Sequence, residues 1–293
     1  MTDFSTLAGR PTKITARGFG WTHSGRTQPA LADIDLVIEP GERVLLCGDS
    51  GSGKSTFLAA IAGVLGSDEE GTRTGEILLE DSTGAVEEPG HSIPVGLVLQ
   101  DPDSQVISAR VGDDIAFGCE NLAYPREEIW RRVAAAKDLV GPFVDMDFPT
   151  ERLSGGQKQR LALAGVIAMG AGVVLLDEPT ANLDPAGARD VVRAVSALVE
   201  ETGATLVVVE HQHTAWEGLL DRAVEIAHGR IVADGPFEQI ARRRRVEELP
   251  QARELGDGAA REGDAALWSK DLVTRFGPPR TISLPAGAST VIT

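Results

Sequence analysis

A glycine-rich segment near the amino-terminal end has the residue types and spacing of a phosphate-binding loop. It consists of Gly48, Asp49, Ser50, Gly51, Ser52, Gly53, Lys54, Ser55 and Thr56, which fit the pattern G-x-x-x-x-G-K-[ST]. The glycines let successive backbone N–H groups point into one concavity that suits phosphate oxygens. Lys54 can reach the β- and γ-phosphates, and the Ser55 hydroxyl can bind Mg²⁺. The segment therefore predicts a nucleoside triphosphate site.

The residues on either side supply the structural context that this loop requires. Residues 43–47 form an apolar run typical of a short buried strand, and residues 56–62 begin an apolar helix. The amino terminus of that helix adds a partial positive charge beside the phosphates. A glycine-rich turn that fits the pattern by chance is the alternative, and the flanking strand and helix count against it.

Polar side chains end three further apolar runs. Gln100 follows residues 94–99, Asp177 and Glu178 end residues 173–178, and His211 ends residues 205–211. A parallel strand buried on both faces reads as a continuous apolar run, and ligands bind at the carboxyl edge of such sheets. The two carboxylates suit catalysis, with Asp177 for Mg²⁺ and Glu178 for a water molecule. A lone histidine is usually structural, but its place on this edge favours a functional role for His211.

Two other features allow two interpretations each. Ser154, Gly155, Gly156 and Gln157 begin a helical pattern, so they predict either a second anion-binding helix terminus or a simple helix cap. Trp21 ends the first strand region, where an indole could stack on a purine base or pack in the core. The residues alone leave both choices open.

The remaining pattern alternates strands and helices. Strands are expected at 14–19, 36–38 and 75–80, and helices from about residue 111 to residue 144, inserted between two strands. A terminal hairpin is expected at 224–232, with His228 and Gly229 as its turn. The chain is therefore predicted to be an α/β protein.

Composition limits the partners. The 293 residues are 42% hydrophobic and carry a formal net charge of −16, which argues against nucleic acid as the main partner. The basic run Arg242–Arg245 is followed by acidic residues and is interpreted as a solvated helix or linker. Two cysteines form no disulfide framework or metal cluster. Without a signal sequence or an apolar run of membrane-spanning length, we expect a cytoplasmic protein.

Taken in order, these motifs resemble the ATPase subunits of ABC transporters, over about residues 12 to 240. The matches are the Walker A loop at 48–56, the Q-loop at Gln100, the LSGGQ signature at 153–157, the Walker B strand with its glutamate at 173–178, the D-loop at 183–184, and the switch histidine His211. The D-loop reads Ala181-Asn182-Leu183-Asp184, where the family more often has serine and then alanine. The resemblance implies a P-loop NTPase fold with a mostly parallel core sheet, an antiparallel β subdomain and a helical insertion at about 101–165.

Residues 100–129 and Val209-Glu210-His211 also resemble the energy-coupling factor group, whose ATPases drive uptake of vitamins or of cobalt and nickel ions. The resemblance implies ATP and Mg²⁺ as ligands. Trp21 would stack on adenine; Ser55, Gln100 and Asp177 would hold Mg²⁺; Glu178 would polarise the attacking water and His211 would contact the γ-phosphate, with Lys54 on the phosphates.

The family also implies two partners. One is a second ATPase domain in a head-to-tail dimer, whose site Ser154 and Gly156 would complete; the other is a transmembrane coupling subunit moved through the helical insertion. The chain would then lie on the inner face of the cell membrane. The competing hypotheses are a soluble tandem ABC protein that clamps a ribosome or DNA, and a regulatory nucleotide binder, which intact Glu178 and His211 disfavour.

The carboxyl-terminal residues form an internal repeat. Residues 241–264 are expected to be a linker, and residues 283–293 parallel residues 35–47, with Gly287 aligned to Gly41. Residues 271–277 likewise resemble the opening strand near residues 17–20. We therefore expect residues 265–293 to be the start of a second, truncated ATPase-like domain; an ordinary carboxyl-terminal extension is the alternative.

Overall fold

A computed structural model describes residues 7, 9–66, 70–141, 144–211, 213–248, 265–274 and 277–285. The chain divides into two units, Met1–Arg245 and Val246–Thr293. The first unit holds every motif named above.

A six-stranded sheet forms the centre of the first unit, in the order β10-β9-β3-β8-β7-β6. Its strands are β3 (Arg43–Cys47), β6 (Val95–Val98), β7 (Val173–Asp177), β8 (Thr205–Val209), β9 (Arg222–Ala227) and β10 (Arg230–Pro236). All neighbours are parallel except β9 and β10. The five residues of β8 are all buried, as a strand covered on both faces requires. The predicted α/β class with a mostly parallel core sheet is confirmed.

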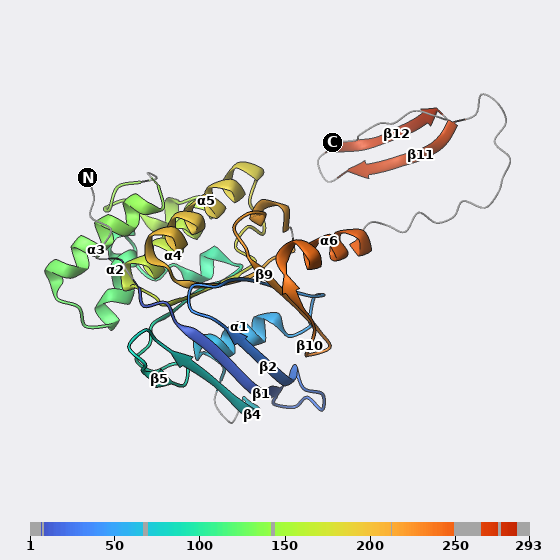
Figure 1. The fold of residues 1–293 in the computed structure, drawn as a ribbon. Helices are drawn as coiled ribbons and strands as arrows, with labels where there is room; N and C mark the ends of the chain where they lie inside the picture. Colours follow the sequence, from blue (N-terminus) through green and yellow to red (C-terminus); the bar gives the residue numbers. More distant parts are fainter. Residues whose placement is uncertain are drawn as a thin grey trace. The chain divides into compact units, whose positions relative to one another are not determined.

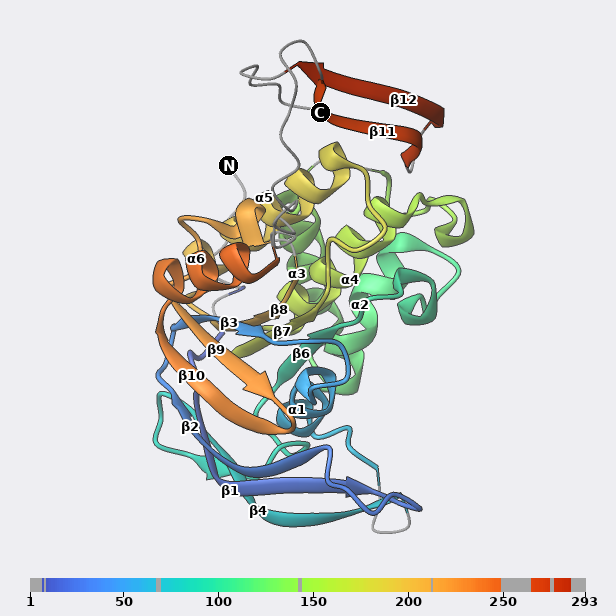
Figure 2. The same ribbon diagram turned by 90° about the vertical axis from the view of Figure 1, so that its right-hand side faces the viewer.

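A second, antiparallel sheet has the order β2-β1-β4-β5. Its strands are β1 (Lys13–His23), β2 (Leu31–Ile38), β4 (Gly71–Glu80) and β5 (Val86–Glu87). Figures 1 and 2 show helix α1 (Lys54–Ala62) between this sheet and the central sheet. Phe19 of β1 meets Phe57 of α1 with ring centroids 6.4 Å apart. The helix that follows the phosphate loop is thus held between two sheets.

Four helices pack on the other face of the central sheet. They are α2 (Val111–Asn121), α3 (Arg126–Leu139), α4 (Gly155–Met169) and α5 (Pro185–Thr202), and three short helical turns accompany them: η2 (Pro102–Gln105), η3 (Thr150–Arg152) and η4 (His213–Trp216). The side chains of these helices share one buried cluster with the facing side chains of the sheet. Helices α2 to α4 all lie between β6 and β7 in the sequence, where we expected helices to be inserted.

The expected hairpin at residues 224–232 is present as β9 and β10, which pair Ala227 with Arg230. His228 and Gly229 have φ values of 50° and 73° and form its two-residue turn. Two consecutive left-handed residues give the turn a twist that matches the strands. This hairpin extends the parallel sheet by one antiparallel edge strand.

The prediction of a linker at residues 241–264 is wrong for residues 241–248, because these residues belong to helix α6 (Phe237–Glu248). Phe237, Ile240 and Ala241 are buried and hold the helix against the first unit. Arg244, which we expected to be solvated, is only 9% exposed. The charge run misled the prediction because the carboxylates that pair with it come from distant parts of the sequence. Residues 249–264 lie outside the described residues.

In the second unit, strands β11 (Ala265–Thr274) and β12 (Gly277–Pro285) form an antiparallel pair. Strands β1 and β2 of the first unit are paired in the same way. This likeness supports the proposed repeat, whose residues 286–293 lie outside the described residues. Within the described part of the chain, no helix combines the length and apolarity needed to cross a bilayer.

Packing of β6 on α4 can be tested at Gly96. A Cβ atom there would lie 2.2 Å from Cγ1 of Val166, so Gly96→Ala forces the strand and the helix apart. We expect the free energy of unfolding to fall by about 1–3 kcal/mol in urea denaturation. Gly165→Ala is the matched control, since nothing lies within 4 Å of a Cβ atom there and alanine favours a helix. Equal stability of Gly96→Ala and wild type would contradict this packing.

Candidate functional site

The phosphate loop connects β3 to α1, and its glycines are required by conformation and by space. Gly48, Gly51 and Gly53 have φ values of 142°, 76° and 108°. A Cβ atom on Gly48 would lie 2.1 Å from the carbonyl oxygen of Ile226, and one on Gly53 would lie 2.5 Å from that of Ala30. Only glycine has both the freedom and the size to allow this backbone path.

Lys54 lies inside the loop. Its Nζ donates hydrogen bonds of 2.8 Å to the carbonyl oxygens of Gly48 and Asp49, and the residue is only 6% exposed. Burial lowers the pKa of Lys54, while the nearby carboxylates of Glu178 and Asp177 act against this shift. Among the described residues the Lys54 ammonium is held by two backbone carbonyls, and a bound phosphate would supply it with an anionic partner.

Ser52 gives a second sign that the loop is shaped for a ligand. Its Oγ atom is buried and has no hydrogen-bond partner among the described residues. A buried hydroxyl without a partner is costly, so such an atom marks a place where a polar group is expected to bind. Asp49, Ser50, Gly51 and Ser55 are exposed on the same loop, and Thr56 is half-buried at the start of α1. The loop therefore fits a triphosphate.

The structure brings Gln100, Glu178 and His211 together from the ends of three strands. Nε2 of Gln100 donates a hydrogen bond of 3.0 Å to Oε2 of Glu178, and Nε2 of His211 lies 3.1 Å from Oε1 of the same carboxylate. Glu178 has a φ value of 49°, which is rare for a residue other than glycine. The turn after β7 therefore directs the carboxylate between its two partners.

Asp177, the last residue of β7, is close to Ser55 and Lys54 of the phosphate loop. Burial raises the pKa of Asp177, while a hydrogen bond with the Ser55 hydroxyl and the charge of Lys54 lower it. A carboxylate and a hydroxyl side by side are hard oxygen ligands of the kind that Mg²⁺ prefers. Among the described residues no group of three or more His, Cys, Asp or Glu side chains could hold a metal. The expected Mg²⁺ ligands Ser55, Gln100 and Asp177 include only one carboxylate, so they do not form a group of that kind.

Glu210 is a candidate site residue that we missed. It is 5% exposed; its Oε2 accepts a 2.6 Å hydrogen bond from the Thr180 hydroxyl, and its Oε1 accepts one of 3.0 Å from the backbone N–H of His211. Glu210 thus joins the turn after β7 to the turn after β8. A carboxylate directly before a histidine at a strand end was the only sequence signal for this role.

Gln159 and Lys158 of α4 are two further residues that we missed. Nε2 of Gln159, which is 2% exposed, donates to the carbonyl oxygen of Leu99 at 3.2 Å, and Lys158 forms an ion pair with Asp103. These contacts tie the segment around Gln100 to the helix that carries the signature residues. Their position next to the signature, in one helix, was the available signal.

The signature residues cap α4. Ser154 and Gln157 form a reciprocal capping box, in which the Ser154 hydroxyl accepts from the Gln157 N–H and the Gln157 side chain accepts from the Ser154 N–H. Ser154 and Gly155 are exposed, and Gly156 is half-buried. A Cβ atom on Gly155 or Gly156 would have Leu183 as a neighbour at 3.8–3.9 Å, so the signature lies beside the D-loop. The cap and an exposed anion site are compatible.

Trp21 lies in the interior. It is 4% exposed, its ring carbons would lie 2.3 Å from a Cβ atom on Gly71, and its Nε1 donates to Nδ1 of His23 at 3.2 Å. This placement supports the core-packing interpretation, since a buried indole offers no free face to a base. Adenine stacking stays a prediction that requires the ring to uncover one face.

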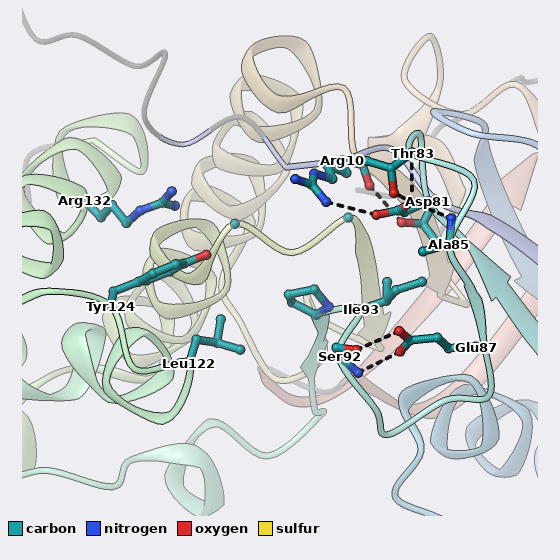
Figure 3. A pocket seen from close by; sticks show the side chains of 14 residues that line it. Arg10, Asp81, Thr83, Ala85, Glu87, Ser92, Ile93, Leu122, Tyr124 and Arg132 are labelled. Atoms are coloured by element: carbon teal, nitrogen blue, oxygen red, sulfur yellow. Dashed lines mark hydrogen bonds and ion pairs between the residues drawn. The ribbon is translucent and has the colours of Figure 1, made fainter.

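A cavity of about 550 Å³ lies apart from the phosphate loop (Figure 3). Ile93, Pro94 and Gly172 line it just before β6 and β7, so it is at the amino ends of these strands, opposite Gln100 and Asp177. Its charged groups bind one another or the backbone, in the contacts Arg10–Asp81, Glu87–Ser92 and Arg132–Ala168. This cavity is therefore separate from the candidate nucleotide site.

Glu210 can be tested by replacing it with its amide. Glu210→Gln leaves one oxygen and one NH₂ group, so either Thr180 or His211 loses its acceptor. We expect the rate of nucleotide hydrolysis to fall about tenfold, the effect of one lost buried hydrogen bond, with little change in nucleotide affinity. Thr180→Val, which removes only the hydroxyl contact, is the matched variant. Hydrolysis by Glu210→Gln at the wild-type rate would show that His211 is positioned without Glu210.

Comparison with known proteins identifies the family. The ABC transporter family profile matches residues 31–181. The energy-coupling factor transporter ATP-binding protein EcfA1 of Caldanaerobacter subterraneus is 36% identical over 249 residues, which are 81% of this chain and 86% of that protein. A putative ABC transporter ATP-binding protein of Methanosarcina acetivorans is 39% identical over 226 residues, which are 77% of this chain. The match spans only 35% of that longer relative.

Solved structures agree. The structure of cbiO1 from Clostridium perfringens, described as part of the ABC transporter complex cbiONQ, has a TM-score of 0.67, with 31% identity over 80% of this chain and 92% of that one. A dimeric ATP-binding cassette bound to ADP and Pi has a TM-score of 0.63 at 22% identity, with 76% of this chain and 98% of that one covered, and it supports the fold alone. The chain belongs to the ABC transporter family and, within it, resembles the energy-coupling factor transporter ATP-binding proteins.

Proposed function

We propose that this chain binds and hydrolyses ATP to power an ABC-type importer of the energy-coupling factor kind. The observation that carries the proposal is the Glu178 carboxylate, held between Gln100 and His211 on the edge that also carries the phosphate loop. A structural role alone would not require a glutamate with left-handed backbone and two polar partners at this edge.

Each residue of the site has a role that follows from its position. The loop N–H groups and Lys54 would hold the phosphates, and Ser55, Gln100 and Asp177 would bind Mg²⁺, which neutralises charge on the β- and γ-phosphates. Glu178 would orient the attacking water: its oxygens each keep a second lone pair while they contact Gln100 and His211. His211 would donate a hydrogen bond to the γ-phosphate and would thereby stabilise charge in the transition state.

The site needs a second ATPase domain. Ser154 and Gly155 are exposed at the amino terminus of α4, a helix of 15 residues whose partial positive charge suits phosphate. In a head-to-tail dimer this terminus would cover the γ-phosphate on the partner domain, and the partner would do the same in return. The D-loop neighbours of the signature, Leu183 and Asp184, would lie in the same interface.

The helical insertion offers a surface for a membrane subunit. Ile107, Phe117 and Trp130 of this region are 60%, 37% and 40% exposed, and exposed apolar side chains suit contact with a partner protein. Ile107 belongs to the segment that begins at Gln100, and its N–H donates to Asp114 of α2 at 2.8 Å. A change at Gln100 on nucleotide binding can therefore reach this surface along one short segment.

The neighbours support the transport role. The structural neighbour cbiO1 is described as part of an ABC transporter complex, and the relative EcfA1 is named an energy-coupling factor transporter ATP-binding protein. We infer a vitamin or a transition-metal ion as the solute class and the inner face of the cell membrane as the location. The alternative, a clamp on a ribosome or DNA, is not favoured, because the net charge of −16 would oppose binding to a phosphate backbone.

The proposal predicts how Glu178→Gln behaves in a complex with a membrane coupling subunit. The chain should co-purify with a multispanning membrane protein rather than with ribosomes. Glu178→Gln should lower ATP turnover and solute uptake about a hundredfold or more, because the base is lost, while it retains ATP binding. Turnover at the wild-type rate in the assembled complex would show that Glu178 is not the catalytic carboxylate, and co-purification with ribosomes would favour the clamp.

The shared site predicts complementation between two inactive variants. Lys54→Ala removes the phosphate contact in a chain's own loop, and Ser154→Arg blocks the signature that serves the partner. In a mixed dimer, one of the two sites regains an intact loop and an intact signature. An equal mixture should recover about a quarter of the wild-type sites, because half of randomly formed dimers are mixed and each has one complete site. The measurement is made at concentrations where wild-type turnover per chain rises with concentration. If the mixture recovers no turnover there, the shared site is contradicted.

A further inference from the structure

Arg244 links the carboxyl-terminal helix α6 to the phosphate loop. Its Nη2 is 3.1 Å from Oδ1 of Asp49, and its Nη1 is 2.8 Å from Oε1 of Glu225. Arg243 forms an ion pair with the other oxygen of Glu225. Figure 1 shows α6 beside β9, the strand that carries Glu225. These four side chains form a cluster, here called the α6 clasp, and only Asp49 among them belongs to a family motif.

The α6 clasp lies directly against the start of the loop. Glu225 is paired with Cys47 in the parallel register of β9 and β3, and Cys47 immediately precedes Gly48. The guanidinium is the buried part of the cluster: the Arg244 side chain is 10% exposed, whereas that of Asp49 is 90% exposed. Arg244 is therefore fixed by packing and by Glu225, and it forms an ion pair with Asp49 of the loop.

The charges in this cluster affect the nucleotide site. Asp49 places a carboxylate on the loop that must accept a polyanion, so an unpaired Asp49 would repel phosphate. The ion pairs of the α6 clasp set the positive charges of Arg243 and Arg244 against the carboxylates of Glu225 and Asp49. The positive charge of Arg244 also acts on its neighbours. Burial raises the pKa of Cys47 to about 11, and Arg244 is the strongest of the charges that oppose this shift.

We propose that Arg244 is a positioning residue of the nucleotide site, which neutralises Asp49 and fixes the first residues of the phosphate loop so that the loop accepts a triphosphate. The inference rests on the proposed binding of ATP. It makes α6 part of the nucleotide site, although this helix lies almost 200 positions after the loop in the sequence. A displacement of α6 would remove the Arg244 partner of Asp49 and weaken ATP binding.

The test is a double-mutant cycle on ATP and ADP affinity in the full chain. Arg244→Gln should weaken ATP binding roughly three- to tenfold by calorimetry, and ADP binding less, because the carboxylate of Asp49, without its Arg244 partner, acts on fewer phosphate charges in ADP. Asp49→Asn in the Arg244→Gln background should restore most of the ATP affinity. Arg244→Lys, which keeps the positive charge, should lie near wild type. Arg243→Ala, which removes one ion pair of Glu225, serves as the control for loss of α6 packing.

The outcomes separate the possible roles. If Asp49→Asn does not restore the affinity of Arg244→Gln, or Arg243→Ala weakens binding equally, Arg244 only anchors α6 and the proposal is overturned. Thermal unfolding of each variant shows whether α6 packing changed. If Arg244→Gln does not fold, Arg244→Lys is compared with and without Asp49→Asn. Asp49→Asn is then expected to change the ATP affinity of Arg244→Lys as much as it changes that of wild type. If wild type binds neither nucleotide, the proposed function itself fails.

Discussion

The parallel register of the central sheet is the constraint on which the site depends. Leu46 pairs with Val209, Val209 pairs with Asp177, and Leu176 pairs with Val98, so four strands end at nearly the same level. The phosphate loop, the carboxylates, Gln100 and His211 all follow these ends. Because the strands are buried on both faces, a shift in register would move apolar side chains out of the core. The stability of the core and the geometry of the site therefore have one cause.

Within this edge, a set of buried polar residues holds the turns in place. Glu210 joins Thr180 to His211, Gln159 holds the Leu99 carbonyl, and Arg244 binds Asp49. Each is buried and each bridges segments that are distant in the sequence. Such residues determine how accurately the reacting groups are placed, since phosphoryl transfer depends mainly on positioning and on charge stabilisation.

The sequence predicted the parts of the molecule that depend on local patterns. The apolar runs of β7 and β8 ending in Glu178 and His211 led to the strands, to their common edge and to the candidate catalytic residues. The burial of Trp21, Arg244 and Glu210 could not be predicted from local patterns. A tryptophan at a strand end or an arginine in a basic run has the same sequence pattern whether it is exposed or buried. The partners of these residues are remote in the chain: Gly71 for Trp21, Glu225 for Arg244 and Thr180 for Glu210.

By itself the sequence determined the phosphate loop, the fold class and the candidate catalytic residues, because each depends on a residue type at a set spacing along the chain. Only the tertiary structure decided that Glu178 lies between Gln100 and His211, that the Trp21 ring is enclosed, and that α6 contacts the loop through Arg244. The physical reason is that burial and charge pairing are properties of surfaces brought together by folding. Those surfaces come from segments whose distance in sequence carries no information on their distance in space.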